Sequence, residues 1–311
     1  MGIVKAINIS EKRGTVKYSV EEARLVKDWG IEGDAHAGHW HRQVSLLSYE
    51  KIEEFKARGA QLEPGAFGEN LIVEGFDFRS LPVGTIFRCN GVVLEMSQIG
   101  KECHTHCQIY KRMGECIMPT QGVFAEVLHG GAIRPGDEMV IDEALKDQRL
   151  KAAVVTLSDK GAAGERKDES GPLIESLLKE QGYRIMESLL LADDQKRLET
   201  ELIRLADARQ VDLILTTGGT GFSLRDVTPE ATMAVATRNA PGIAEAIRAY
   251  SMQYTKRAML SRGASVIRNR TLIVNLPGSP KAVKESLECV LPQLEHGIML
   301  LRGSVSDCAR K

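Results

Sequence analysis

The residues best suited to chemistry lie in one glycine-rich stretch of the chain. An apolar run of strand length, residues 212–216, is followed by Thr217, Gly218, Gly219, Thr220 and Gly221, and soon after by Arg225 and Asp226. Glycines can adopt positive φ angles and bring backbone N–H groups close to a bound group. Thr228-Pro229-Glu230 then predicts a helix start, with a hydroxyl N-cap and proline at the first helical position. Because a helix N-terminus favours negative charge, this strand, loop and helix are predicted to bind a phosphate or pyrophosphate.

Asp226 is the acidic residue of this loop, and two interpretations of it stay open. A carboxylate beside phosphates repels them unless a cation lies between the two, which predicts a Mg²⁺ site. Alternatively, Asp226 caps a turn and interacts with the dipole of the helix that follows. The spacing alone favours neither interpretation.

The elements that position this loop belong to the second half of the chain, residues 150–303. Strand and helix patterns alternate there, which indicates an α/β domain with a mainly parallel sheet and helices on both faces. We expect strands at residues 152–157, 184–190, 212–216 and 271–276, and helices with leucine stripes around residues 173–178 and 198–205. Ligands in such sheets bind at the carboxyl ends of the strands.

Polar or flexible residues follow each expected strand. They are Ser158 and Asp159 after the first, Asp193 after the second, the glycine loop with Arg225 and Asp226 after the third, and Pro277, Gly278 and Ser279 after the last. Four separate stretches therefore converge on one rim of the sheet, which favours a phosphate site over simple turn capping. Asp194 is more simply explained as the N-cap of the next helix. A helix expected near Lys281 offers a second N-terminus for an anion.

Four basic residues are candidates to pair with phosphate: Arg225, Arg262, Arg268 and Lys281. Each could equally be a solvated surface charge. The sequence G-x-x-x-x-G-K-S/T does not occur, so ATP would not be held as it is in P-loop enzymes. The glycine loop would have to hold the nucleotide.

Three segments of this half resemble, in the same order, the signature of the molybdopterin adenylyltransferase family. They run from Ser158-Asp159 to Ser170-Gly171-Pro172, from Thr217 to Thr232, and from Asn275 to Lys281, with Ser279 where the family commonly has Asn. The resemblance implies transfer of AMP from ATP to the terminal phosphate of molybdopterin, with release of pyrophosphate. It also implies that Asp193 and Asp226 are the essential aspartates, and we expect them to hold Mg²⁺. The other residues named after the strands are expected to bind the substrates.

Two other functions stay open for the chain. One is a non-catalytic carrier that binds molybdopterin or the finished cofactor, although storage alone does not require metal-binding carboxylates. The other is a transition-metal-binding protein that uses the cysteines and histidines of the first half. Relatives of the second half are often trimers, so the resemblance also implies a homo-oligomer that works with other proteins of molybdenum cofactor synthesis.

The first half, residues 1–143, is dense in short β-like runs. They lie at residues 3–9, 44–47, 70–73, 85–88, 92–96 and 139–141, and one helix is expected from Tyr49 to Arg58. Many short strands with one helix predict a β-rich barrel. Several short sequence motifs resemble those of the MOSC domain: Gly33-Asp34, His41-Arg42-Gln43-Val44, residues 65–71, Val83-Gly84 and Gly136-Asp137. That family is thought to bind molybdenum cofactor or to carry sulfur on one cysteine, and Cys107 aligns best with that cysteine.

The cysteine cluster has three possible roles. It comprises Cys103, His104, His106, Cys107 and Cys116, with Lys101 nearby. A reactive thiolate is favoured by neighbouring positive charge, whereas the same side chains could ligate Zn²⁺ or another transition metal, or simply be buried thiols. His41, Arg42 and Lys101 could bind a pterin phosphate. A solvated loop explains His36, His39 and His41 equally well.

Length, composition and net charge limit the number of domains and the classes of function to be expected. The chain of 311 residues is ordinary for two domains of about 150 residues each, joined here by the polar stretch 142–148. A net charge of −1 and the lack of a basic block argue against nucleic-acid or membrane-surface binding. No signal peptide and no apolar run long enough to span a bilayer is present, so we expect a cytoplasmic protein with reduced cysteines.

Overall fold

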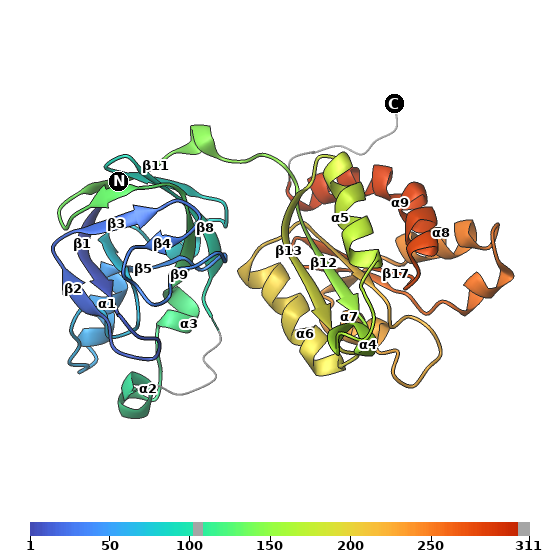
Figure 1. Cartoon of the computed structure of the whole chain (residues 1–311), viewed down its shortest axis with the longest axis horizontal. Helices are drawn as coiled ribbons and strands as arrows, with labels where there is room; N and C mark the ends of the chain where they lie inside the picture. The colour runs from blue at the N-terminus through green and yellow to red at the C-terminus, as the bar shows by residue number, and fades with distance from the viewer. Residues whose placement is uncertain (102–107, 304–311) are drawn as a thin grey trace. The chain divides into compact units, whose positions relative to one another are not determined.

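The computed structural model of the chain describes residues 1–101 and 108–303 (Figure 1). The chain divides into two compact units, Met1–Asp147 and Gln148–Lys311. A single 3₁₀ turn, η2 (Glu143–Leu145), lies in the polar stretch just before the division. Each unit has its own core and is described by itself.

The N-terminal unit is a closed β-barrel. Its sheet order is β11-β7-β8-β9-β5-β6-β1, and the barrel closes because β1 pairs with β11 through Gly2 and Ile3. The strands are β1 (Gly2–Ile9), β5 (Val44–Ser48), β6 (Leu71–Glu74), β7 (Ile86–Cys89), β8 (Val92–Ile99), β9 (Val123–His129) and β11 (Glu138–Ile141), with β2 (Tyr18–Val20) paired to β1. Closure leaves an apolar interior that includes Leu46, Phe78 and Phe87. The predicted barrel is confirmed.

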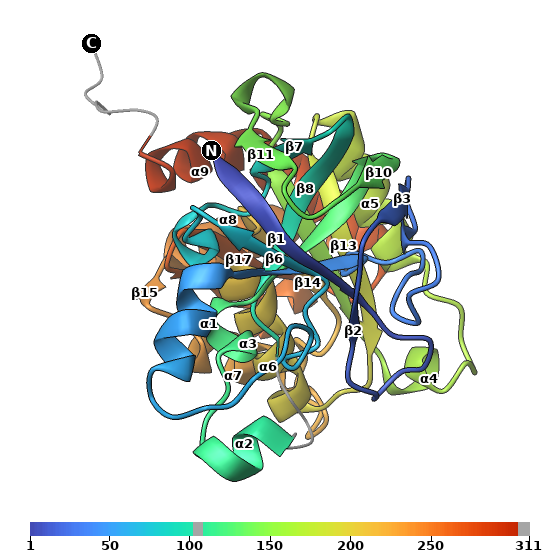
Figure 2. The ribbon, with the colours of Figure 1, turned by 90° about the vertical axis from the view of Figure 1, so that its left-hand side faces the viewer.

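Smaller elements surround the barrel strands (Figure 2). A separate three-stranded sheet contains β3 (Ala23–Val26), β4 (Gly30–Ile31) and β10 (Gly131–Ile133). The helices are α1 (Tyr49–Lys56), α2 (Gln108–Met113) and α3 (Met118–Gln121), with a 3₁₀ turn η1 (Phe78–Ser80). Helix α1 buries Ile52 and Phe55, the face expected from the sequence, but it ends before the predicted Arg58. Strand β9 is a barrel strand that the sequence reading missed.

The C-terminal unit is built on a six-stranded sheet of order β13-β12-β14-β17-β16-β15. Its strands are β12 (Lys151–Leu157), β13 (Arg184–Leu191), β14 (Leu213–Thr217), β15 (Arg238–Asn239), β16 (Ser265–Arg268) and β17 (Thr271–Leu276). The first three and β17 are parallel, whereas β16 and β15 add an antiparallel edge. The prediction of a mainly parallel sheet is therefore confirmed.

Helices cover both faces of this sheet and make three layers (Figure 1). They are α4 (Asp159–Ala162), α5 (Ser170–Glu180), α6 (Gln195–Ile203) with a π-helical turn η3 (Arg204–Ala208), α7 (Thr228–Ala234), α8 (Pro241–Ser251), the 3₁₀ turn η4 (Lys256–Leu260) and α9 (Pro280–Leu301). Because side chains alternate along a strand, Val154 packs in one core with α5, α8 and α9. Its neighbour Val155 packs in the other core with α6 and α7.

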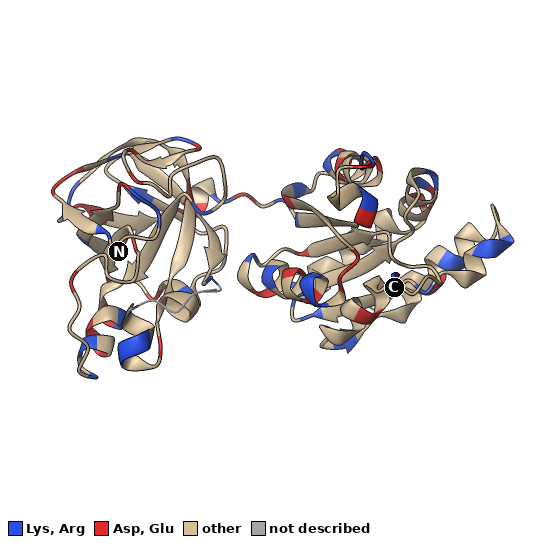
Figure 3. Ribbon diagram, turned by 60° about the horizontal axis from the view of Figure 1, so that its bottom comes forward, with Lys and Arg blue, Asp and Glu red and all other residues tan. Residues whose placement is uncertain are grey.

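The surface carries mixed charge. Figure 3 shows basic and acidic residues interspersed along the helices of both units. Within the residues that the structure describes, no helix combines the length and apolar character needed to cross a membrane.

The sheet core makes a testable contribution to stability. Leu215 of β14 is 0% exposed, whereas Leu224 is 100% exposed. We expect Leu215→Ala to lower the free energy of unfolding of this unit by about 2–5 kcal/mol, because it deletes buried methyl groups and leaves a cavity. Leu224→Ala makes the same chemical change in solvent and should stay within about 0.5 kcal/mol of wild type. Equal losses in urea titrations of the two variants would contradict this assignment of the core.

Candidate active site

The carboxyl ends of three neighbouring strands meet at one rim of the C-terminal sheet. Thr156 of β12 pairs in register with Thr217 of β14, and Thr217 pairs with Leu276 of β17. The segments that follow these strands therefore begin at the same level. The structure brings Ser158, the glycine loop and Pro277-Gly278-Ser279 to this rim.

The glycine loop is held in one conformation by close backbone contacts. Gly218 and Gly219 have φ angles of +90° and +63°, which side chains other than glycine rarely adopt. A methyl group on Gly218 would lie 2.3 Å from the Leu157 carbonyl oxygen. Thr217 Oγ1 donates to the Pro277 carbonyl at 2.7 Å. The loop has no room for larger residues at its first glycine.

Thr228 fixes the other side of the loop. Its hydroxyl donates to the Gly218 carbonyl at 2.9 Å, and its N–H donates to the Gly219 carbonyl at 3.1 Å. The predicted hydroxyl cap at Thr228 is wrong, because α7 has Val227 at its cap position and no side-chain cap. The hydroxyl faces the loop because its backbone already belongs to the first helical turn.

Two aspartates border this loop from different segments. A methyl group on Gly219 would lie 3.2 Å from Asp193 Oδ1, and one on Gly221 would lie 2.9 Å from Asp226 Oδ2. Asp226 Oδ2 also accepts from the Ser223 N–H at 2.8 Å, so this aspartate does cap a turn. Its position beside the loop is equally compatible with a metal-binding role.

Burial raises the pKa of Asp193, and the negative charges of Asp159 and Asp226 raise it further. Like charges gathered in this way attract a cation. Asp194, by contrast, accepts from the Arg197 N–H at 2.9 Å and caps α6, as the sequence predicted.

Asp159 and Arg225 pair with each other at the edge of the site. Arg225 Nη2 and Nε donate to the two oxygens of Asp159 at 2.7 and 3.0 Å. The guanidinium lowers the pKa of Asp159. Asp159 also accepts from the Asp193 N–H at 3.0 Å, and its own N–H donates to Asp193 Oδ2 at 3.1 Å. The Arg225 side chain is 64% exposed, so a phosphate can reach it from solvent.

The other predicted cations have different roles. Arg262 donates to the carbonyls of Gly221 and Asp226, each at 2.6 Å, and therefore ties the loop together. Arg268 is paired with Asp207. Both side chains are engaged by protein oxygens, so neither is simply a solvated surface charge, and a contact with phosphate stays a prediction for both. Lys281 is largely exposed and lies 4.0 Å from Glu285.

A cavity of about 300 Å³ is lined in part by the first residues of the glycine loop. Of the residues singled out from the sequence, Ser158, Thr217, Gly218, Gly278 and Ser279 line it. Asp193, Asp226 and Arg225 do not. The predicted site residues thus form two groups, with Gly218 bordering the cavity and Gly219 and Gly221 bordering the carboxylates.

The sequence analysis missed five polar residues of this cavity. The residues are Thr156, Arg166, Lys167, Asp168 and Glu169. Asp168 had a signal, because an aspartate two residues before Ser170, where α5 begins, is a typical capping position. The two basic residues carry no comparable pattern.

The carboxylates fit Mg²⁺ in number and chemistry. Mg²⁺ is usually held by one or two protein carboxylates, with waters and substrate phosphates completing its shell. Asp193 and Asp226 supply two carboxylates beside one loop. Across residues 1–101 and 108–303, no group of three or more His, Cys, Asp or Glu side chains could hold a metal by itself.

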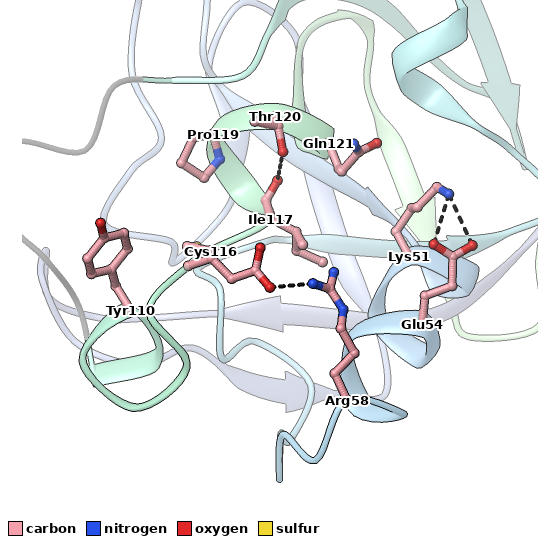
Figure 4. Close-up of a pocket in the computed structure, with 11 residues that line it drawn as sticks. Lys51, Glu54, Arg58, Tyr110, Cys116, Ile117, Pro119, Thr120 and Gln121 are labelled. Atoms are coloured by element: carbon pink, nitrogen blue, oxygen red, sulfur yellow. Dashed lines mark hydrogen bonds and ion pairs between the residues drawn. The ribbon is translucent and has the colours of Figure 1, made fainter.

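Of the predicted cysteine and histidine cluster in the first half, only Cys116 lies within the described residues. Cys103, His104, His106 and Cys107 lie outside the described residues. Cys116 lines a cavity of about 630 Å³ together with Tyr110 and Pro119 (Figure 4). Two ion pairs, Arg58–Glu115 and Lys51–Glu54, lie at its edge. Burial raises the pKa of the Cys89 thiol to about 11, so that cysteine is a core residue.

The predicted phosphate-binding residues of the first half, His41, Arg42 and Lys101, all lie within the described residues. His41 Nε2 lies 2.9 Å from Gln98 Oε1, and the Arg42 guanidinium lies over the Trp40 ring at 4.7 Å. Lys17 forms a buried ion pair of 2.5 Å with Asp34. Burial lowers the pKa of Lys17, and Lys101 lowers it further because it is a second positive charge nearby.

Comparison with known proteins matches both halves of the chain. Residues 153–296 match the family described as a probable molybdopterin binding domain, and residues 33–140 match the MOSC domain. The molybdopterin adenylyltransferase of Helicobacter pylori is 40% identical over 166 residues, which cover 53% of this chain and 94% of that protein. The Drosophila melanogaster molybdenum cofactor synthesis protein cinnamon is 39% identical over 161 residues, 51% of this chain and 27% of that protein.

A solved structure is also similar. The molybdopterin biosynthesis enzyme MoaB from Thermus thermophilus has 44% sequence identity and a TM-score of 0.48, covering 50% of this chain and 97% of its own.

The α/β fold, the loop at its rim and the matching family model define the class of molybdopterin-binding domains. The chain belongs to the molybdopterin adenylyltransferase family, and a MOSC domain precedes that region. Both family resemblances seen in the sequence are confirmed. Membership places the chain among proteins of molybdenum cofactor biosynthesis.

The glycine loop gives a second stability test. Gly218→Ala should lose more stability than Gly182→Ala, although both positions have similar positive φ angles of +90° and +83°. A methyl group at Gly182 meets no atom within 4 Å, whereas at Gly218 it meets a backbone carbonyl that cannot yield. Strain alone costs about 1–2 kcal/mol, and the clash adds to it at Gly218. Urea titration measures both variants, and equal losses would show that the loop is free to move.

Proposed function

We propose that the C-terminal unit transfers AMP from ATP to the terminal phosphate of molybdopterin and releases pyrophosphate. The observation that carries this proposal is the rigid glycine loop with Asp193 and Asp226 on its border. It lies in a region that is 40% identical to a molybdopterin adenylyltransferase over nearly all of that enzyme. The cavity and the carboxylates border different residues of the loop, which gives separate places to two substrates.

This reaction requires little proton transfer. An oxygen of the molybdopterin phosphate attacks the α-phosphorus of ATP, and the bond from that phosphorus to the oxygen bridging the α- and β-phosphates breaks. The pyrophosphate leaves with the electron pair of that bond. A phosphate monoester with a second pKa near 6 is already largely dianionic at neutral pH. The protein therefore has to position two anions rather than supply a strong base.

Different residues of the chain are suited to different parts of positioning the two anions. N–H groups of the glycine loop are suited to phosphate oxygens, and Arg225 can exchange Asp159 for a phosphate because its side chain is exposed. Asp193 and Asp226 would hold Mg²⁺. When bound, the ion neutralises charge on the phosphates. Arg262 and Thr228 keep the loop in place.

For the N-terminal unit we propose a role with a later form of the same cofactor, which it binds or to which it supplies sulfur. The match to the MOSC domain supports this. Cys107 stays the proposed sulfur carrier. We also propose a homo-oligomer, a trimer in line with the family, that works with other proteins of cofactor synthesis.

The first functional test is Asp226→Asn. Asparagine keeps an oxygen that can accept from the Ser223 N–H, so the turn should be retained. Loss of the charge should reduce formation of adenylyl-molybdopterin by about 10–100-fold at ordinary Mg²⁺, in line with metal sites that lose a supporting carboxylate. Raised Mg²⁺ should restore part of the activity. Glu288→Gln, at an exposed position of α9, is the control for a lost surface charge, and full activity of the Asp226→Asn protein would exclude a metal role.

A second test uses the raised pKa of Asp193. A carboxyl group whose pKa is higher in the folded than in the unfolded chain destabilises the fold as the pH rises through that window. Asp193→Asn should therefore match or exceed the wild-type melting temperature at pH 7, while its Mg²⁺-dependent activity falls. The difference in melting temperature should shrink as the pH is lowered towards the ordinary range of aspartate. A variant that is less stable at pH 7 and equally active would contradict both parts.

A further inference from the structure

Asp159 is a third carboxylate near the glycine loop, and the proposed chemistry gives it no metal to hold. Burial raises the pKa of Asp193, and the nearby charge of Asp159 raises it further, so the two carboxylates are close. The same negative charge would repel a substrate phosphate at this rim. Asp159 therefore opposes the binding of a nucleotide unless a positive group compensates its charge.

Asp159 is held in place by hydrogen bonds that do not involve Arg225. Its N–H donates to Asp193 Oδ2 at 3.1 Å, and its Oδ1 accepts from the Asp193 N–H at 3.0 Å. Asp159 is also the first residue of α4, and its carbonyl accepts from the Ala163 N–H at 3.0 Å. Each of these bonds includes a backbone group. They therefore fix the carboxylate whether or not an arginine is paired with it.

Arg225 is the member of the ion pair that is able to move. Its side chain is 64% exposed, and it follows Leu224, which is 100% exposed at the tip of the same loop. Its Nη2 and Nε donate to the two oxygens of Asp159, an arrangement that a phosphate can reproduce with two of its own oxygens. The guanidinium can thus turn from one acceptor to the other without disturbing the core.

We propose that Asp159 is a positioning residue that holds the Arg225 guanidinium in place of a substrate phosphate. A phosphate group of the nucleotide displaces the carboxylate from Arg225, and the carboxylate regains the guanidinium when pyrophosphate leaves. The inference rests on the proposed function and deepens it, because Asp159 changes from an expected substrate ligand into a competitor of the substrate. Its effect is to limit the affinity for polyphosphate and so to favour release of the product.

Asp159→Asn in the full chain separates this role from a structural one. Asparagine keeps an oxygen that can accept from the Asp193 N–H, but it has no charge to hold Arg225. The probe is α,β-methylene-ATP with Mg²⁺, which cannot release pyrophosphate, titrated by calorimetry. Asp159→Asn should bind it about 2–5-fold more tightly than wild type, the range for loss of one exposed competing ion pair. A purely structural aspartate would give weaker binding.

Glu165→Gln is the matched control. It removes a negative charge at an exposed position shortly after α4, and the structure shows no ion pair of Glu165 with any residue that it describes. Its affinity for the probe should stay within about twofold of wild type, as expected for an exposed charge away from the phosphates. Melting temperatures check that both variants are folded.

A double-mutant cycle shows whether Asp159 acts through Arg225. Arg225→Gln alone should weaken binding of the probe about 10-fold, because phosphate loses a charged hydrogen-bond donor. Adding Asp159→Asn to Arg225→Gln should then change the affinity by less than about twofold, since no guanidinium is left to compete for. Equal tightening by Asp159→Asn in both backgrounds would show a general charge effect and overturn the proposal.

Pyrophosphate provides a second readout. In wild type the carboxylate and pyrophosphate compete for the same guanidinium, so pyrophosphate should displace the probe more strongly from Asp159→Asn, by the same factor of about 2–5. Unchanged displacement would contradict a role in release of the product.

Two outcomes separate this inference from the proposed function. If wild type forms adenylyl-molybdopterin but Asp159→Asn binds the probe no more tightly, the role of Asp159 is wrong and the adenylyltransferase function stands. If the cycle shows the expected coupling but ATP, Mg²⁺ and molybdopterin yield no pyrophosphate, competition for Arg225 is upheld and the proposed transfer fails.

Discussion

The close approach of the glycine loop to the end of β12 is the constraint on which the site depends. The Leu157 carbonyl leaves no space for a side chain at Gly218, and the Thr228 hydroxyl lies 2.3 Å from where a methyl group on Gly219 would be. The loop therefore crosses the rim of the sheet with no side chain at Gly218 or Gly219. Gly218 lines the cavity, whereas Gly219 and Gly221 lie beside Asp193 and Asp226.

Charge is distributed around this loop in a way that suits two anionic substrates. The carboxylate side gathers negative charge, which raises the pKa of Asp193 and favours a bound cation. Arg225 lies at its edge, held by Asp159. The lining of the cavity has balanced charge, and the N–H groups at the start of α5 are bound by Asp168.

Much of this could be predicted from the sequence. Alternating strand and helix patterns indicated the parallel sheet, and the rule that ligands bind at carboxyl ends of strands led to the glycine loop and both aspartates. Other contacts depend on the fold and could not be predicted. Arg262, a candidate for phosphate in the sequence, donates to the loop carbonyls. Thr156 has the sequence pattern of an ordinary strand residue, and only the packing shows that its hydroxyl is buried without a partner among the described residues. Strand β9 was not predicted because buried and exposed side chains do not alternate regularly along it.

The most direct test of the account is pyrophosphate release by the full chain. The protein is mixed with ATP, Mg²⁺ and molybdopterin, and each component is omitted in turn. The account predicts stoichiometric pyrophosphate with adenylyl-molybdopterin only when all three are present. Tight binding of molybdopterin without any pyrophosphate would show a carrier instead of a transferase and would contradict the central claim.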